Sequence, residues 1–290
     1  MNLTPLSHDR ATAVLVTGAS GRIGRALRVL LPANRAGALP ILWQGRRGEP
    51  WADLNWDIGA DPQVGLPGGL IILHLAGRTS GGPQDLDENR VLTETVCHAA
   101  NASAAAHVFV MSSAAVYAPG PAALTERAEP APGTAYGRSK LAAERAAAAV
   151  LRGPGLTVLR LANLAGADAL LGNIRDGFPS ILDPVPGQPG GPERSYIGPR
   201  VLAAVLQALV ARAAAAEPLP RILNLAQPGV IAMADLLTAR GQPWSYGPER
   251  AEVVPRVVLD TGLLQSLVPV PTATPAGLVA ELASVPGWPR

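Results

Sequence analysis

A glycine-rich turn between a predicted strand and a predicted helix constrains the fold of this 290-residue chain more than any other feature. The apolar run 13–17 (AVLVT) leads into Gly18, Gly21 and Gly24, and helical spacing continues over 23–31. Glycines at this spacing allow a tight turn, close approach of the backbone to a pyrophosphate, and close packing of helix on sheet. The start of the helix offers N–H groups and the positive end of its dipole to phosphates. The pattern favours dinucleotide binding over a plain strand-to-helix turn.

Short apolar segments alternate with helical segments along most of the chain. We expect strands at 13–17, 40–44, 54–57, 69–75, 107–112, 157–161, 221–225 and 256–260. We expect helices at 23–31, 86–105, 136–151, 201–215, 232–240 and 275–282. Such alternation predicts an α/β fold with a parallel sheet covered on both faces. Residues 165–195 are rich in Gly and Pro, and they are expected to form an irregular excursion.

Composition excludes several classes of protein. A hydrophobic share of 48% is too high for a disordered chain, and a formal net charge of +2 is too small to indicate a nucleic-acid surface. No apolar run is long enough to span a bilayer, so no membrane association is expected. The single cysteine, Cys97, and the absence of a visible secretory signal favour a cytoplasmic location. The four histidines show no metal-ligand spacing, and no metal site is expected.

The segment after the second predicted strand bears on the choice between NAD and NADP. An acidic residue there would accept hydrogen bonds from the ribose hydroxyls of NAD. Here the strand is followed by Arg46 and Arg47, whose guanidinium groups suit a 2′-phosphate. NADP is therefore favoured over NAD, although both arginines could be ordinary solvated residues. Asp57, followed by Ile58, could hold the adenine edge or serve only as a capping residue.

Tyr136 and Lys140 lie four residues apart in a predicted helix, so that both side chains share one face. A neighbouring cation is expected to lower the pKa of a tyrosine, which then serves as acid or base at a carbonyl or an alcohol. The chain has 24 basic residues, of which Lys140 is the only lysine. An arginine stays protonated and could not relay a proton, so this position is expected to require an amine.

The strand 107–112 ends at Ser112, and a second serine, Ser113, follows directly. Sites in α/β folds gather at the carboxyl ends of strands. A serine there can hold the oxygen of a carbonyl substrate, and Ser113 is the stronger candidate, with a turn residue as the alternative.

Taken together, these motifs resemble the extended short-chain dehydrogenase/reductase family, and in particular its NAD(P)-dependent epimerase/dehydratase branch. The resemblance is carried by TGASGRIG (17–24), LHLAG (73–77), MSSAAVY (111–117), YGRSK (136–140) and LRLANLAG (159–166), with a weaker continuation in ERSYI (193–197) and NLAQPG (224–229). It implies a Rossmann-type doubly wound parallel sheet with a small α/β C-terminal substrate domain. We assign 1–164 and 196–226 to the nucleotide-binding domain, and 165–195 and 227–290 to the substrate-binding part.

The resemblance also implies roles for individual residues. It implies that Ser113, Tyr136 and Lys140 are catalytic. Substrate contacts are expected from Ser112, Asn163 and Arg194. Cofactor contacts are expected from Gly18, Ser20, Gly21, Arg22, Ile23, Gly24, Arg46, Arg47, Asp57, Ile58, Leu75, Ala76, Gly77, Asn89, Met111, Tyr136 and Lys140. The resemblance also implies a homodimer through the helices 86–105 and 136–151, although their Ala-rich faces could equally serve the core of the monomer.

Two departures from the family pattern narrow the reaction. Sugar-nucleotide 4,6-dehydratases have Asp-Glu after the catalytic hydroxyl, where this chain has Ala114 and Ala115, which argues against elimination of water. The usual His-Val-Asp-Asp stretch is Gly-Pro-Arg-Val at 198–201. The first hypothesis is an NADP-preferring oxidoreductase that acts on a small molecule resembling a sugar or a sugar nucleotide. No nucleic-acid partner is expected. The alternatives are a sugar-nucleotide 4-epimerase with tightly bound NAD and a non-catalytic dinucleotide-binding regulator.

Overall fold

The computed structural model describes residues 11–31, 39–61, 64–174, 178–250 and 253–288. Seven strands form its central sheet: β1 (Val14–Thr17), β2 (Ile41–Gly45), β3 (Leu54–Asn55), β4 (Ile71–His74), β5 (His107–Ser113), β6 (Gly155–Leu161) and β11 (Ile222–Leu225). The strand order is β11-β6-β5-β4-β1-β2-β3, and every neighbouring pair is parallel. The predicted doubly wound α/β fold is confirmed.

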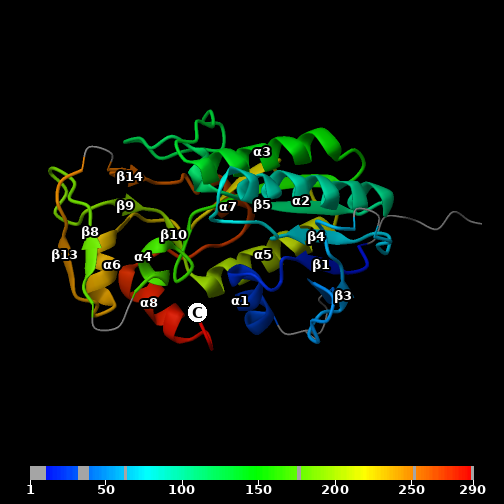
Figure 1. Cartoon of the computed structure of the whole chain (residues 1–290), viewed down its shortest axis with the longest axis horizontal. Helices are drawn as coiled ribbons and strands as arrows, with labels where there is room; N and C mark the ends of the chain where they lie inside the picture. The colour runs from blue at the N-terminus through cyan, green and yellow to red at the C-terminus, as the bar shows by residue number, and fades with distance from the viewer. Residues whose placement is uncertain (1–10, 32–38, 62–63, 175–177, 251–252, 289–290) are drawn as a thin grey trace, which may run out of the picture.

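Two layers of helices cover the sheet (Figure 1). One face carries α1 (Arg22–Leu30) and α5 (Pro199–Ala214), and the other carries α2 (Pro83–Ala102) and α3 (Ala135–Val150). Alternating residues of β1 serve the two faces, as strand geometry requires. Val14 and Val16 pack with Leu27 of α1, whereas Leu15 packs with Val96 of α2. This alternation explains why the strand reads as a continuous apolar run in the sequence.

Shorter elements gather beyond the carboxyl ends of the strands, at one end of the molecule in Figure 1. They are β7 (Asn163–Leu164), α4 (Ala169–Gly172), β8 (Ser180–Leu182), β9 (Glu193–Arg194), β10 (Tyr196–Ile197), β12 (Ile231–Ala232), α6 (Met233–Ala239), β13 (Trp244–Tyr246), β14 (Arg256–Val257) and α8 (Pro275–Ala283). The short helix α7 (Gly262–Leu267) packs instead against β11 of the central sheet. Residues 165–195 are largely irregular, as expected, but α4, β8 and β9 lie within them. Their two to four residues are too short to show periodicity.

The order of the strands places a crevice at the carboxyl end of β1. This strand pairs with β2 on one side and with β4 on the other, so the direction of the connections reverses there. Ligands of open α/β sheets bind at such a switch point. In the described ranges, no helix combines the length and apolarity needed to cross a membrane.

Candidate active site

The glycine loop between β1 and α1 is held against two neighbouring strands. Gly18 has a φ of +70°, and a Cβ on it would come within 2.5 Å of the main-chain nitrogen of Ala76. Its N–H donates to Oε1 of Gln44 at 2.9 Å, and Nε2 of Gln44 donates to the oxygen of Trp56 at 2.6 Å. Gln44 therefore fixes the loop from the end of β2. The sequence analysis did not select this residue, although it occupies the end of a predicted strand.

Two cavities meet at this loop. The smaller has a volume of about 210 Å³ and lies between the loop and the ends of β2 and β3, where Arg46 and Asp57 line it. The larger has a volume of about 890 Å³ and extends towards α3 and the short elements. Both are lined by Gly18, Gly21, Leu75, Gly77 and Arg78. A cleft that continues on both sides of an exposed glycine backbone fits a dinucleotide, whose pyrophosphate would lie at the loop and the start of α1.

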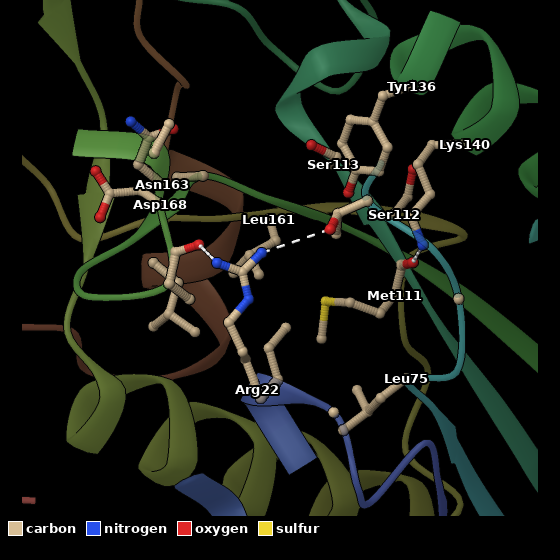
Figure 2. Close-up of a pocket in the computed structure, with 18 of the residues that line it drawn as sticks. Arg22, Leu75, Met111, Ser112, Ser113, Tyr136, Lys140, Leu161, Asn163 and Asp168 are labelled. Atoms are coloured by element: carbon tan, nitrogen blue, oxygen red, sulfur yellow. Dashed lines mark hydrogen bonds between the residues drawn. The ribbon is translucent and has the colours of Figure 1, made fainter. Parts of the chain in front are cut away.

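Ser113 and Tyr136 come from separate elements that are packed tightly together. Ser113 ends β5, and its Oγ accepts a hydrogen bond from the Ala115 N–H at 3.2 Å. Thr134 caps α3, accepting from the Gly137 N–H at 3.0 Å. A Cβ on Gly137 would overlap the main-chain oxygen of Ala115, so a glycine is needed for this approach. The two side chains consequently lie beside each other on one wall of the larger cavity (Figure 2).

Burial raises the pKa of Tyr136 above its ordinary value, whereas a hydrogen bond with Ser113 and the positive charge of Arg22 act in the opposite direction. The sequence analysis expected Lys140 to lower this pKa. The net direction is the reverse, and the cation that opposes the effect of burial is Arg22. The net rise comes from burial, and the Lys140 ammonium donates instead to the main-chain oxygen of Met111.

Lys140 is 8% exposed and its Nζ donates to the main-chain oxygen of Met111 at 2.9 Å. Burial lowers its pKa from 10.5 to about 8, and the negative charge of Glu144 acts against this shift. The ammonium is therefore mostly charged at neutral pH and loses its proton when the pH rises above about 8. Both it and Met111 line the larger cavity.

His74 and Asn89 hold the elements around the site in place through hydrogen bonds. The His74 ring lies between the hydroxyls of Thr17 (2.8 Å) and Thr93 (3.2 Å), and burial together with Lys140 lowers its pKa to about 3. Oδ1 of Asn89 accepts from the Arg78 N–H at 2.8 Å, and its Nδ2 donates to the Arg78 oxygen at 3.0 Å. Asn89 thereby shapes the loop after β4 without lining either cavity.

The far end of the larger cavity is polar. Arg22 crosses it from the start of α1, and its Nη1 donates to the Ala167 oxygen at 2.6 Å (Figure 2). Asn163, Asp168 and Arg194 line the same end. Asp168 accepts from the hydroxyl of Tyr196 at 3.1 Å, and burial raises the pKa of its carboxyl. These groups can hold a hydroxylated or anionic substrate.

The structure brings together most of the residues that the sequence analysis selected. The larger cavity is lined by Gly18, Gly21, Arg22, Ile23, Gly24, Leu75, Gly77, Met111, Ser112, Ser113, Tyr136, Lys140, Asn163 and Arg194. The smaller is lined by Gly18, Ser20, Gly21, Arg46, Asp57, Ile58, Leu75, Ala76 and Gly77. Arg47 and Asn89 line neither. Sequence reasoning missed Gln44, Thr79, Asp168, Asn173 and Met233.

Comparison with known proteins extends these observations. The model of the family described as "NAD dependent epimerase/dehydratase family" matches residues 14–180, which is more than half of the chain. No curated protein matches the sequence significantly.

Several solved structures share the fold. MoeE5 in complex with UDP-glucuronic acid and NAD is 22% identical, with a TM-score of 0.72 over 94% of this chain and 99% of that one. UDP-glucose-4-epimerase from Stenotrophomonas maltophila, with bound NAD, is 20% identical, with a TM-score of 0.73 over 93% and 96%. A dTDP-glucose 4,6-dehydratase from Streptomyces venezuelae, also with NAD, is 20% identical, with a TM-score of 0.70 over 96% and 99%.

Proposed function

The chain belongs to the NAD-dependent epimerase/dehydratase family of enzymes, and from this premise we propose that it transfers hydride to or from a carbonyl or secondary alcohol of a sugar-like substrate. The observation that supports this most is the shared wall of Ser113, Tyr136 and Lys140 in a cavity that begins at the glycine loop. The hypothesis of a non-catalytic regulator is set aside, because the family consists of enzymes.

Each residue of this set has a distinct proposed role. Tyr136 exchanges a proton with the substrate oxygen, and Ser113 donates a hydrogen bond that holds this oxygen. Lys140 holds ribose hydroxyls and passes protons to solvent. The dinucleotide, when bound, supplies the reversible hydride donor and acceptor. Its pyrophosphate is proposed to bind at Gly21 and the first turn of α1, and its adenosine end at Asp57 and Arg46.

A sugar-nucleotide 4-epimerase is the second candidate, and the family match and the fold of the UDP-glucose-4-epimerase support it. In that case one carbon loses a hydride to the dinucleotide and regains it on the other face, while Tyr136 accepts and returns the proton, so the dinucleotide shows no net turnover. A dehydratase is less well supported, because Ala114 and Ala115 follow Ser113 and carry no acid or base.

The test measures turnover of the dinucleotide with a panel of carbonyl compounds and UDP-sugars. Steady consumption of NADPH or NADH with a carbonyl substrate supports the oxidoreductase and contradicts the epimerase. Interconversion of two UDP-sugars by protein that retains its dinucleotide contradicts the oxidoreductase. Neither activity, in protein shown to bind the dinucleotide, contradicts both.

The preference between NAD and NADP is proposed to depend on Arg46. This side chain lines the smaller cavity beside Ser20 and Asp57, where the adenosine ribose would lie. A guanidinium there favours a 2′-phosphate, and the two residues directly after β2 are arginines rather than the acidic residue that would bind the ribose hydroxyls. We therefore propose NADP. Because solved structures of this fold contain NAD, the test compares the binding of both dinucleotides to this protein.

We also propose a division of the chain into a nucleotide-binding domain and a substrate-binding part, and the formation of a homodimer. Residues 165–195 and 227–290 are proposed to bind the substrate, since Asp168, Arg194 and Met233 line the larger cavity from those segments. Their buried residues, among them Leu171, Leu182 and Leu278, form a core cluster of their own. A homodimer through α2 and α3 is proposed from the packing of these two helices side by side (Figure 1), and light scattering tests it.

A further inference from the structure

A buried ion pair lies one helical turn beyond Lys140, and the proposed chemistry does not use it. Glu144 and Arg160 are 6% and 2% exposed. Arg160 donates to both carboxylate oxygens, from Nε at 3.1 Å and from Nη2 at 2.7 Å, and it packs over the ring of Tyr117. Because the desolvation of two charges can exceed their attraction, a buried pair is weak evidence for a purely stabilising role.

The carboxylate of Glu144 accepts a third hydrogen bond, from a residue of the site itself. The hydroxyl of Ser112 donates to Oε1 of Glu144 at 2.5 Å. Ser112 precedes Ser113 on β5, and both line the larger cavity. Glu144 thus ties α3, which carries Tyr136 and Lys140, to the end of the strand that carries Ser113.

Glu144 also acts on Lys140 through space. Residues four apart on a helix share one face, and the two side chains are four apart on α3. The charge of Glu144 raises the pKa of Lys140, whereas burial lowers it. The other groups near this ammonium are the neutral His74 of β4 and Asn89, whose Oδ1 also lies beside Gly77. Tyr136 lies one turn earlier on α3 and lines the same cavity. Arg160, from β6, is bonded to Glu144 and not to Lys140.

We infer that Glu144 is a positioning residue of the active site, which fixes the end of β5 through Ser112 and keeps the neighbouring Lys140 charged, with Arg160 as its counter-ion. The inference rests on the proposed roles of Ser113 and Lys140. It assigns to a buried ion pair the task of coupling the strand and the helix that supply the reacting side chains.

The sequence itself provides the means to test this inference. Lys140 is the only lysine of the chain, so protein labelled with [¹³C]lysine and free of lysine in any added tag gives one lysine Cε signal. A titration of this signal by NMR reads the protonation of Lys140 directly. The measurement needs neither substrate nor turnover, so its result is independent of whether the proposed function is correct.

We expect a titration midpoint near 8 in the unmodified protein. Glu144→Gln removes the anion and lowers the midpoint by about one pH unit. Arg160→Met removes the counter-ion and moves the midpoint in the opposite direction. Glu144→Asp keeps the negative charge, so its midpoint should lie close to that of the unmodified protein. A role in packing alone would not give changes of opposite sign.

Glu217→Gln is the matched control, because it breaks the exposed pair between Glu217 and Arg212 and should leave the midpoint unchanged. Equal midpoints in Glu144→Gln, Arg160→Met and the unmodified protein overturn the inference, as do shifts of the same sign. If Glu144→Gln does not fold, as judged by circular dichroism, Arg160→Met is read instead, and an unchanged or lower midpoint overturns the inference. Absence of turnover with the expected shifts would count against the proposed function only.

Discussion

Arg22 at the start of α1 donates a hydrogen bond to the main-chain oxygen of Ala167, 145 residues away, at 2.6 Å. The contact joins the glycine loop to the segment that enters α4, across the cavity in which Tyr136 lies. The proposed cofactor end and the proposed substrate end of the cleft therefore share one cationic side chain. Its charge also opposes the effect of burial on the pKa of Tyr136.

Arg22→Ala should shift the pH dependence of activity. Loss of the cation raises the pKa of Tyr136 further, so the deprotonated phenol that accepts a proton during alcohol oxidation forms at higher pH. The acidic limb of the kcat profile in that direction is expected to move to higher pH. Arg25→Ala removes the same charge from the same helix at a residue that lines a different cavity, and its profile should match that of the unmodified protein.

Lys140→Arg should lower kcat by at least about 100-fold. A guanidinium stays protonated and is larger than the ammonium that fits against Met111, so it can neither relay a proton nor occupy the same position. Thermal unfolding should show that the fold is retained. The control is Arg138→Lys, the reverse exchange at an exposed position on the same helix, which should stay active. Activity close to normal in Lys140→Arg would refute the requirement for an amine.

The free energy of unfolding should decrease as the pH falls below 6.5, because His74 is buried in its neutral form. Burial lowers its pKa from 6.5 to about 3, so between these values the unfolded chain binds a proton that the folded chain does not. The free energy of unfolding then decreases by about 1.4 kcal/mol for each pH unit below 6.5. His107, with a pKa lowered to about 4, adds to this slope. Urea unfolding at several pH values should give a shallower slope for His74→Gln, and equal slopes would contradict this account.

Arg46→Ala should weaken NADPH binding by about 10-fold or more while leaving NADH binding nearly unchanged, because the charge-assisted bonds go to the 2′-phosphate alone. Isothermal titration calorimetry with both dinucleotides measures the ratio. Arg47→Ala is the matched control, since the neighbouring arginine lines neither cavity. Equal losses in the two variants, or tighter binding of NADH by the unmodified protein, would contradict the NADP preference.

Local patterns in the sequence predicted the parts of the site that depend on neighbouring residues. The glycine loop follows a strand and opens a helix, and the four-residue spacing of Tyr136 and Lys140 places both on one face of α3. Ser113 was recognisable because it directly follows a predicted strand. In each case the relevant geometry is set within one or two adjacent elements.

Contacts between distant segments could not be predicted in this way. The amide of Gln44 lies between the glycine loop and Trp56, and Arg160 reaches Glu144 from a neighbouring strand. Nothing in the local pattern distinguishes these residues from the other buried or charged ones. Asn89 was selected as a cofactor contact, yet its side chain bonds to the main chain of Arg78 after β4 and to the hydroxyl of Ser139 on α3.

The most direct test of the central claim compares Tyr136→Phe with the unmodified protein. The change removes one hydroxyl from the wall that Tyr136 shares with Ser113 and keeps the ring. The account predicts that kcat falls by at least about 100-fold while the Kd for the dinucleotide stays within about twofold. Turnover that survives in Tyr136→Phe with normal dinucleotide binding would contradict the assignment of Tyr136 as the proton-transferring residue.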